Sequence, residues 1–459
     1  MGMQEKEKKE NPLYLEIYEY YKNLILLGRM KPGEKLPSIR KCALERQVSK
    51  TTIESSYMQL AAEGYIRAVA GSGYYVSEVN FEEIRRVMPR YKENTEEKKT
   101  LYDYVSSSVD DKSFDFKEWR RYMKSALRHT ERLVAYGNPQ GEYDLRVALM
   151  EYVKEARRVV CSPEQIVIGA GVQSLLSILC ALTGVRSPIC FTGHDFKQGL
   201  AVFRDRGFEV YYQRNLSEDL SFIKEKEAKM LYTFPSHMTP WGEVMSMKMR
   251  LDLLGYAGKN NCLIIEDDYG SEFRYYTRPV PSLQSLDGGQ KVIYMGSFSR
   301  LLLPSLRIAF MVLPADLMEI YKEKGMLYNQ TASTAEQIAL CQFIRDGHLR
   351  KQIKKARKLY MTKSQELGRC IEEVFGDKAK ILPNIGGFLL PFEVKSELSI
   401  KEIEAKTFEA GIKLRVADAL SHEGWPCLLL SCSGVNEKDF MKSMIVLKNI
   451  LFEQNKQRE

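Results

Sequence analysis

The sequence predicts an α/β protein in which a small basic helical module precedes a large domain with a mainly parallel sheet. The chain has 459 residues, enough for two or three domains with buried cores. In the long C-terminal part, short apolar runs such as QIVIGAG, CLIIEDDY and KVIYMGSFS alternate with helical stretches. That alternation is typical of a parallel sheet covered by helices, with ligand-binding groups at the strand ends.

The composition excludes several classes of protein. The first residues, MGMQEKEKKENP, are charged and lack the apolar core of a signal peptide. No run approaches the roughly 18 apolar residues of a membrane span. Nine cysteines are scattered without C-x-x-C pairs, and five histidines show no H-E-x-x-H spacing. We therefore expect a cytoplasmic protein with reduced thiols, no membrane span and no metal site.

Residues 12–77 are predicted to form one compact module of three helices and a hairpin. The segment LYLEIYEYYKNLILLG has helical spacing, with an inner face made of Leu13, Ile17, Tyr20, Tyr21, Leu24 and Leu27. Ser38 is expected to cap a second helix, IRKCALERQ, and Ser49 a third, KTTIESSYMQLAAEG. The segment YIRAVAGSGYYV predicts two short strands around Gly71. Two short helices joined by a tight turn and followed by a hairpin describe a winged helix-turn-helix.

The charge of this module favours nucleic acid as its partner. From Arg29 to Lys50 the chain carries seven Lys or Arg against two Glu, a net charge of +5. Lys50, Thr51 and Thr52 open the third helix, at the end that reaches base edges and phosphates in such motifs. The alternative is a three-helix interaction module whose basic face is merely solvated, but helix-turn-helix, wing and charge together favour DNA binding.

The module resembles the GntR-type winged helix, whose pattern runs Pro-Ser-x-Arg, then Ser-Arg-x-Thr, then Gly-x-Gly in the wing. The pattern occurs here within LPSIRKCALERQVSKTTIESSYMQLAAEGYIRAVAGSGYYV. The resemblance implies that the DNA-contact positions are Arg40, Ser49, Lys50, Thr51, Thr52 and Gly71. Two departures are Lys50 in place of the commoner arginine, which loses a bidentate fork, and the acidic Glu54 on the recognition helix.

Residues 78–99 mix both charges and are expected to form a solvated linker, followed by a single large domain over residues 100–459. Three strand ends in that domain carry chemistry. A turn that can cradle a phosphate is formed by Gly171, Val172 and Gln173. A buried strand ends in acids and an aromatic residue, among them Asp267 and Tyr269. A third strand leads to further candidate phosphate ligands, Ser297, Ser299 and Arg307.

These segments resemble fold-type I aminotransferases that use pyridoxal phosphate, and specifically the MocR/GabR-type regulators, in which a GntR-type module precedes such a domain. The signatures AYGNPQGEYDLRVAL, IGAGVQSLL, TFPSHMTPWGEVMS, LIIEDDYGSEFRYY and VIYMGSFSRLLLPSLRIAFMVLP occur in family order. The resemblance implies a mainly parallel sheet with a smaller C-terminal α+β lobe. It also implies that Asp267 pairs with the pyridine nitrogen, Tyr269 with the ring hydroxyl, and Phe196 stacks on the ring. The phosphate would be held by Ser297, Ser299, Arg307 and the turn at Gly171–Gln173.

The sequence departs from that family at its reactive residue. The lysine that forms the Schiff base belongs at position 300, where this chain has Arg300. An imine needs a neutral amine, whereas a guanidinium, with a pKa above roughly 12, stays protonated. No internal aldimine is therefore expected, and transaminase activity should be lost. The arginine expected to bind a substrate carboxylate is replaced by Leu429, and a customary glutamine by Met238.

Three interpretations of Arg300 fit these residues. The pocket binds pyridoxal phosphate or pyridoxamine phosphate noncovalently; or it binds another acidic or phosphorylated molecule, with Arg300 as an anion clamp; or Arg300 pairs with Asp267 in a closed pocket without a cofactor. The sequence thus predicts a homodimeric, DNA-binding transcriptional regulator whose degenerate aminotransferase-like domain senses a small ligand. The alternatives are an active aminotransferase with an appended DNA-binding module and a ligand-free architectural dimer.

Overall fold

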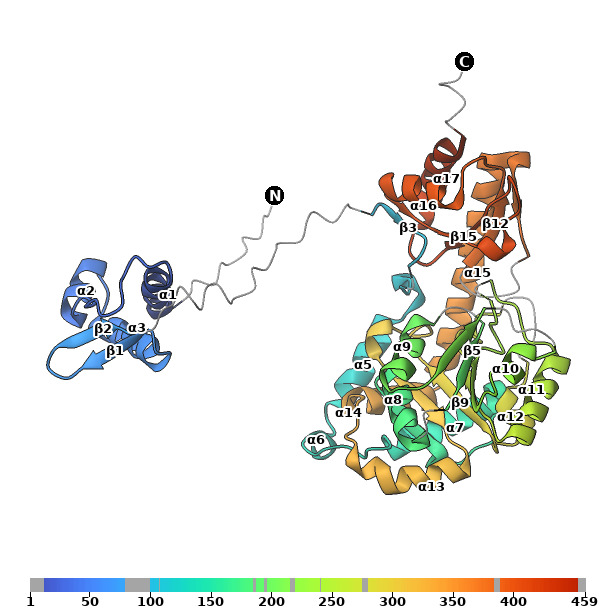
Figure 1. Ribbon diagram of the computed structural model, residues 1–459, viewed down its shortest axis with the longest axis horizontal. Helices are drawn as coiled ribbons and strands as arrows, with labels where there is room; N and C mark the ends of the chain where they lie inside the picture. The colour runs from blue at the N-terminus through green and yellow to red at the C-terminus, as the bar shows by residue number, and fades with distance from the viewer. Residues whose placement is uncertain are drawn as a thin grey trace, which may run out of the picture. The chain divides into compact units, whose positions relative to one another are not determined.

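The computed structural model divides into two compact units, Met1–Glu97 and Lys98–Glu459 (Figure 1). The residues that it describes are 12–78, 100–106, 108–184, 187–193, 196–214, 219–239, 241–274, 280–383 and 389–452. Apart from residue 78, the predicted linker lies outside the described residues.

The smaller unit contains the three predicted helices and the hairpin. Its elements are α1 (Leu13–Leu26), α2 (Ile39–Arg46), α3 (Lys50–Ala62), β1 (Ile66–Val69) and β2 (Gly73–Val76). Ser38 caps α2 by accepting a hydrogen bond from the Lys41 N–H at 3.3 Å, and Ser49 caps α3 through the Thr52 N–H at 3.1 Å. Both caps lie where the sequence predicted them.

The predicted inner face of α1 is partly wrong. Leu13, Tyr20 and Leu27 are 59%, 42% and 47% exposed, whereas Tyr18 and Ile25 are buried. Helix α1 packs against α3, and this contact buries the side of α1 that carries Tyr18 and Ile25. Leu13, Tyr20 and Leu27 belong to an adjoining apolar stripe that remains exposed. A helical period alone does not distinguish the two stripes, because both satisfy the same spacing.

The hairpin is extended by the turn that precedes α2. Strands β1 and β2 pair antiparallel, with Ile66 opposite Val76. Lys35 forms a bridge to Tyr75 on the outer side of β2, and the Leu36 N–H donates to the Tyr74 carbonyl at 2.9 Å. Gly71, at the tip, has a φ of 73°, a conformation that favours glycine. These pairings fix the wing to the body of the module.

The larger unit is built around a seven-stranded sheet with the order β4-β10-β9-β8-β7-β5-β6. Neighbours from β9 to β6 are parallel, whereas β10 is antiparallel to both β9 and β4. The strands are β4 (Ile166–Gly169), β5 (Ile189–Thr192), β6 (Val210–Gln213), β7 (Met230–Thr233), β8 (Leu263–Asp267), β9 (Val292–Ser297) and β10 (Ala309–Val312). The mainly parallel sheet is confirmed, and the antiparallel β10 was not predicted.

Helices cover both faces of this sheet (Figure 1). One face packs against α8 (Val172–Thr183), α9 (Lys197–Asp205) and α13 (Ala315–Lys324). The other packs against α10 (Ser221–Glu225), α11 (Met247–Asn260) and α12 (Leu283–Asp287), and further along against α5 (Phe116–Ala126), α7 (Tyr143–Arg157) and α14 (Thr334–Arg345). A short helix, α6 (Thr130–Leu133), precedes α7. The strands are therefore buried on both sides, as their continuous apolar runs require.

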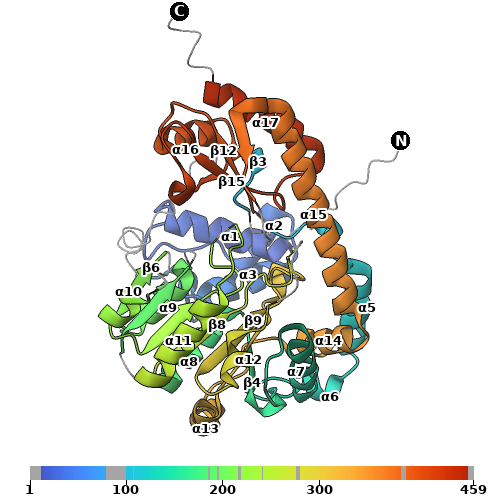
Figure 2. The same cartoon turned by 90° about the vertical axis from the view of Figure 1, so that its right-hand side faces the viewer.

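A smaller α+β lobe follows the long helix α15 (His348–Phe375), which runs from the large sheet to this lobe (Figure 2). Its antiparallel sheet has the order β11-β12-β15-β14, made of β11 (Ala379–Ile381), β12 (Leu389–Val394), β14 (Arg415–Val416) and β15 (Cys427–Ser431). Helices α16 (Ile400–Glu409) and α17 (Glu437–Phe452) complete the lobe. Along the described residues, no helix is both long and apolar enough to span a bilayer.

The segment that follows the linker is part of this lobe. Strand β3 (Tyr102–Asp103) pairs in parallel with β13 (Ile412–Lys413). The Tyr104 carbonyl then accepts a hydrogen bond from the Ser431 N–H at 2.8 Å, and the Ser431 hydroxyl donates to the Ser106 carbonyl at 3.0 Å. Residues 102–106 are thus tied along the C-terminal sheet.

Candidate functional site

A cavity of about 510 Å³ opens at the carboxyl ends of the parallel strands, where such sheets usually bind ligands. Its walls include nine of the ten residues that the sequence suggested for the cofactor: Val172, Gln173, Phe196, Asp267, Tyr269, Ser297, Ser299, Arg300 and Arg307. The tenth, Gly171, lies against Arg307. The structure therefore brings the candidates from five separate segments to one place.

One end of the cavity combines a helix N-terminus with a guanidinium. Gly171 caps α8 with a φ of 87°, and a Cβ built there would lie 2.6 Å from Arg307 Nη2. Arg307 lies two residues before the antiparallel β10, which starts opposite the end of β9, with Ala309 paired to Ser297. Both groups are electropositive, so an anion between them would be stabilised by each. Ser297 and Ser299, whose hydroxyl oxygens are 3.3 Å apart, add two hydroxyl donors to the wall.

A buried carboxyl lies elsewhere in the same cavity. Asp267, at the end of β8, accepts a 2.6 Å hydrogen bond from the Tyr232 hydroxyl on the neighbouring β7. Burial raises the pKa of Asp267 to about 7; the Tyr232 hydrogen bond opposes this rise, and the nearby charge of Asp268 adds to it. Asp267 is thus a buried acid in the cavity wall.

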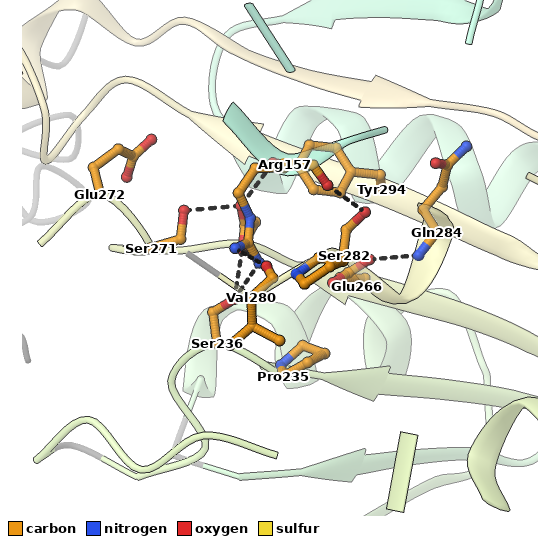
Figure 3. A network of polar contacts seen from close by, with 12 residues as sticks. Arg157, Pro235, Ser236, Glu266, Ser271, Glu272, Val280, Ser282, Gln284 and Tyr294 are labelled. Carbon is orange, nitrogen blue, oxygen red and sulfur yellow. Dashed lines mark hydrogen bonds and ion pairs between the residues drawn. The ribbon is translucent and has the colours of Figure 1, made fainter. Parts of the chain in front are cut away.

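The two acids beside Asp267, Glu266 and Asp268, face the opposite way from Asp267, because alternate residues of an extended chain point to opposite sides. Both hold neighbouring segments of the protein in place. Asp268 accepts a bidentate ion pair from the buried Arg157, at 2.7 and 2.9 Å, and a 2.7 Å hydrogen bond from the Tyr294 hydroxyl. The hydroxyls of Ser236 and Ser271 also donate to it, and Figure 3 shows this network around Arg157.

Glu266 accepts the backbone N–H groups of Leu283 and Gln284, at 2.8 and 2.9 Å, and so fixes the start of α12. The same region holds Arg250, which is fully buried and donates to three backbone carbonyls, including that of Pro235. The PSH and EDDY signatures therefore include many residues whose role is to position the cavity wall. In the described regions, no group of three His, Cys, Asp or Glu is placed to hold a metal ion.

Aromatic side chains form the middle of the cavity. The Phe196 ring lies over Gly199, where an added Cβ would be 2.4 Å from the ring. The ring can therefore occupy this position because residue 199 has no side chain. Tyr269 packs edge-on against His237, with ring centroids 6.4 Å apart. The Arg300 guanidinium lies 6.0 Å above the centre of the Tyr269 ring, within reach of a cation–π contact.

The C-terminal lobe contributes a wall of which the sequence indicated only the strand with Leu429. Leu389, Arg415 and Leu429 line the cavity from the lobe's sheet. Residues 104–106 line it from the segment that follows the linker. Arg415 was missed because only the pairing of β14 with β15 places it beside Leu429.

In the smaller unit, the candidate DNA-contact residues lie on the surface. Arg40, Lys50 and Thr51 are exposed, as are Ser49 and Gly71 at the helix cap and the wing tip, while Thr52 is half-buried. The Ser49 hydroxyl lies 2.7 Å from both the Thr51 and the Thr52 hydroxyls. These three residues therefore shape the start of α3 as well as its surface.

Comparison with known proteins gives the family. Residues 13–76 match the family described as bacterial regulatory proteins of the gntR family, and residues 106–422 match aminotransferase class I and II. The HTH-type transcriptional regulator YdeL of Bacillus subtilis is 36% identical over 95% of this chain and 96% of its own length. "Probable rhizopine catabolism regulatory protein MocR" of Rhizobium meliloti is 30% identical over 83% of this chain and 81% of its own. The chain belongs to the MocR family of HTH-type transcriptional regulators.

This MocR-family regulator also matches a protein named for vitamin B6 metabolism. The pyridoxine biosynthesis transcriptional regulator PdxR of Corynebacterium glutamicum is 27% identical over 80% of this chain and 79% of its own. Among solved structures, the kynurenine aminotransferase of Pyrococcus horikoshii superposes with a TM-score of 0.65 at 20% identity, covering 82% of this chain and 99% of its own. LysN of Thermus thermophilus gives a TM-score of 0.64 at 21% identity, covering 77% of this chain and 92% of its own. At these identities the two enzymes show the fold alone, a fold-type I aminotransferase-like domain.

Proposed function

We propose that this MocR-family regulator senses a small phosphorylated ligand in the cavity of its aminotransferase-like domain, holds it without a covalent bond, and thereby changes its affinity for operator DNA. One observation carries the proposal. The same cavity contains an electropositive site at Gly171 and Arg307 and the buried carboxyl of Asp267. A phosphate at the first and a ring N–H at the second would satisfy both.

A vitamin B6 phosphate fits this donor set. Arg307, Ser297 and Ser299 would hold its phosphate, and Asp267 its pyridine nitrogen. Phe196 would lie against the ring, and Tyr269 would bond its hydroxyl. Pyridoxal phosphate serves enzymes as an electron sink, but the proposal uses only the molecule's shape and charge.

Arg300 supports noncovalent binding and the loss of aminotransferase activity. A guanidinium remains a cation and cannot supply the neutral amine that covalent attachment requires. It can instead form a charge-assisted hydrogen bond to an anionic or polar group of the ligand. Pyridoxamine phosphate is a natural candidate, because it carries its own amine.

The route from cavity to DNA passes through residues 104–106. The DNA-binding module of residues 12–77 is followed by the linker of residues 78–99, and the chain then forms part of the cavity wall at Tyr104, Val105 and Ser106. A ligand that contacts this segment differently in two arrangements of the protein would shift the balance between them. A homodimer would present two winged helices to two half-sites. Large exposed apolar side chains on the larger unit, among them Val134, Tyr136 and Leu327, are what a subunit interface would cover.

Calorimetric titration of the ligand-free full-length protein with pyridoxamine phosphate and with pyridoxal phosphate tests the ligand. The proposal predicts saturable binding of at least one of them, lost in Asp267→Ala, and no borohydride-stable attachment of pyridoxal phosphate. Covalent attachment together with turnover of an amino acid would favour an active aminotransferase instead. An absence of binding would contradict the vitamin B6 ligand and leave either another acidic or phosphorylated ligand or an architectural DNA-binding dimer.

A further inference from the structure

The cavity contains a second cationic residue that belongs to the other lobe. Arg307 lies beside the large sheet, whereas Arg415 lies on β14 in the C-terminal sheet, and both line the same cavity. The Arg415 side chain is exposed at the rim and, among the described residues, takes part in no hydrogen bond or ion pair. It is thus a charged side chain at the cavity whose charge no acid in the described part of the chain neutralises through an ion pair.

The register of the C-terminal sheet determines where Arg415 points. Arg415 on β14 lies directly opposite Leu429 on the antiparallel β15. Directly opposed residues project to the same face of a sheet, with Cβ atoms roughly 5 Å apart. Leu429 is 2% exposed and lines the cavity, so its strand partner is aimed at the same space. Position 429, which is leucine here, provides no charge at this wall.

We propose that Arg415 is the second anion-binding residue of the pocket, and that the ligand carries a carboxylate or similar anion in addition to its phosphate. This inference rests on the proposed function and names the class of ligand more closely. Arg415 would take the place of a charge on β15 by reaching across from the neighbouring strand. Guanidinium suits this task because its planar fork binds both oxygens of a carboxylate.

The charge balance of the cavity also favours a ligand with a second anionic group. Three guanidiniums, those of Arg300, Arg307 and Arg415, line it, and Asp267 is the acid among its described lining residues. A cavity with such an excess of positive charge attracts anions and disfavours neutral ligands. A phosphate bound at Arg307 accounts for one end, which leaves Arg415 to bind another anionic group. The volume, about 510 Å³, is within the range of roughly 300–1,000 Å³ for ligand pockets.

The test compares ligands that differ only in one carboxylate. The N-(5′-phosphopyridoxyl) adducts of glycine and β-alanine carry a phosphate and a carboxylate. N-methyl- and N-ethylpyridoxamine phosphate have the same two skeletons without the carboxylate. Each is titrated calorimetrically into the full-length protein, into Arg415→Gln, and into Lys413→Gln as a matched control. Lys413 is exposed two residues away and does not line the cavity.

The inference predicts that at least one carboxylate adduct binds the unaltered protein about tenfold or more tightly than its skeleton without the carboxylate, as expected for a charge-assisted hydrogen bond. Arg415→Gln should abolish this preference, Arg415→Lys should restore part of it, and Lys413→Gln should retain it. The phosphate-only skeletons should bind Arg415→Gln and the unaltered protein equally well.

Equal binding of all four probes to the unaltered protein would overturn the role of Arg415 while leaving the proposed function in place. A preference that persists in Arg415→Gln would overturn it too, because another residue would then bind the carboxylate. If none of the four binds, this inference fails, whereas the separate titrations with pyridoxamine phosphate and pyridoxal phosphate decide the vitamin B6 ligand of the proposed function.

Discussion

The guanidinium of Arg307 occupies the space that any side chain on Gly171 would need, since a Cβ there would lie 2.6 Å from Nη2. Gly171 also has a φ of 87°, in the region that favours glycine. This close approach places a cation directly at the N-terminus of α8, two positive groups with no acid between them in the described cavity wall. An anion between the two groups would be stabilised by both, which is the physical basis of the proposed phosphate site.

Gly171→Ala should therefore weaken phosphate binding, because the new methyl group pushes the Arg307 guanidinium away. We expect pyridoxamine phosphate to bind about tenfold or more weakly, as for the loss of a charge-assisted hydrogen bond. Gly184→Ala is a matched control: Gly184 ends the same helix, has a φ of 58°, and has open space at its Cβ. Calorimetry on both variants separates backbone strain from displacement of Arg307. Equal affinity in both variants would mean that Arg307 does not hold the phosphate.

Asp267→Asn should stabilise the ligand-free protein at alkaline pH while weakening ligand binding. The pKa of Asp267 is raised from 3.8 to about 7 in the folded state, chiefly by burial. Ionisation thus favours the unfolded chain, so Asp267 costs stability increasingly as the pH rises from about 4 to about 7. The shift sets an upper bound of about 4 kcal/mol on this cost. Asparagine keeps a hydrogen-bond acceptor for Tyr232 and removes the charge.

Thermal unfolding followed by circular dichroism at pH 5 and pH 8 measures this effect. The gain in Tm of Asp267→Asn should be large at pH 8 and small at pH 5, and Asp252→Asn, on the exposed side of α11, should show neither. A gain that does not depend on pH would show that the Asp267 carboxyl is not the group that titrates.

Arg300→Lys should permit covalent capture of pyridoxal phosphate, because lysine can supply the neutral amine that arginine lacks. Borohydride reduction followed by mass spectrometry should detect one adduct per chain, located at position 300, in this variant and none in the unaltered protein. Arg300→Gln, which also lacks an amine, is the control. Failure to capture the aldehyde in Arg300→Lys would mean that the pocket no longer aligns it with position 300.

Lys50→Ala and Arg40→Ala should each weaken binding to DNA selected by the protein itself. Both side chains are exposed on the helix-turn-helix, and each phosphate contact adds about one to the slope of log affinity against log salt concentration. Fluorescence anisotropy across a salt series measures affinity and slope together. Lys401→Ala, on the exposed start of α16 in the other unit, removes the same charge away from the proposed surface. Unchanged affinity in Lys50→Ala and Arg40→Ala would contradict the assigned recognition surface.

Gly434→Ala should disturb the link between cavity and DNA-binding module. A Cβ at Gly434 would lie 2.2 Å from the Asp103 carbonyl oxygen and 2.4 Å from Ser106 Cβ, so residues 103–106 would have to move. We expect ligand-free DNA binding to persist and its response to ligand to shrink. Gly255→Ala, which places a methyl group in open space on α11, should preserve the response. A full response in Gly434→Ala would exclude this segment as the route.

The sequence predicted the arrangement of elements and most of the cavity, because both depend on local signals. Ser38 and Ser49 marked helix starts by capping chemistry, and the strand-end residues Asp267 and Ser297 were recognisable from family motifs. What it missed depends on contacts between distant residues. The Tyr232–Asp267 bond joins neighbouring strands 35 residues apart, and the Arg157–Asp268 pair joins residues 111 apart. Neither separation leaves a periodic pattern in the sequence.

Strand register accounts for the other omission. Arg415 sits in a segment, GIKLRVADAL, that resembles any exposed strand of mixed polarity. Only its pairing with Leu429 reveals that it faces the cavity, because a shift by one residue would turn it to the opposite face. The choice of inner face on α1 failed for a related reason, since packing against α3 determines it.

Operator binding with and without ligand tests the central claim most directly. Fluorescence anisotropy would measure the Kd of the full-length protein for its selected DNA in the absence and presence of saturating pyridoxamine phosphate, and calorimetry would measure the Kd of the ligand with and without DNA. The account predicts that each changes the affinity of the other by the same factor, about fivefold or more. Ligand that binds in the cavity yet leaves DNA affinity unchanged would contradict sensing.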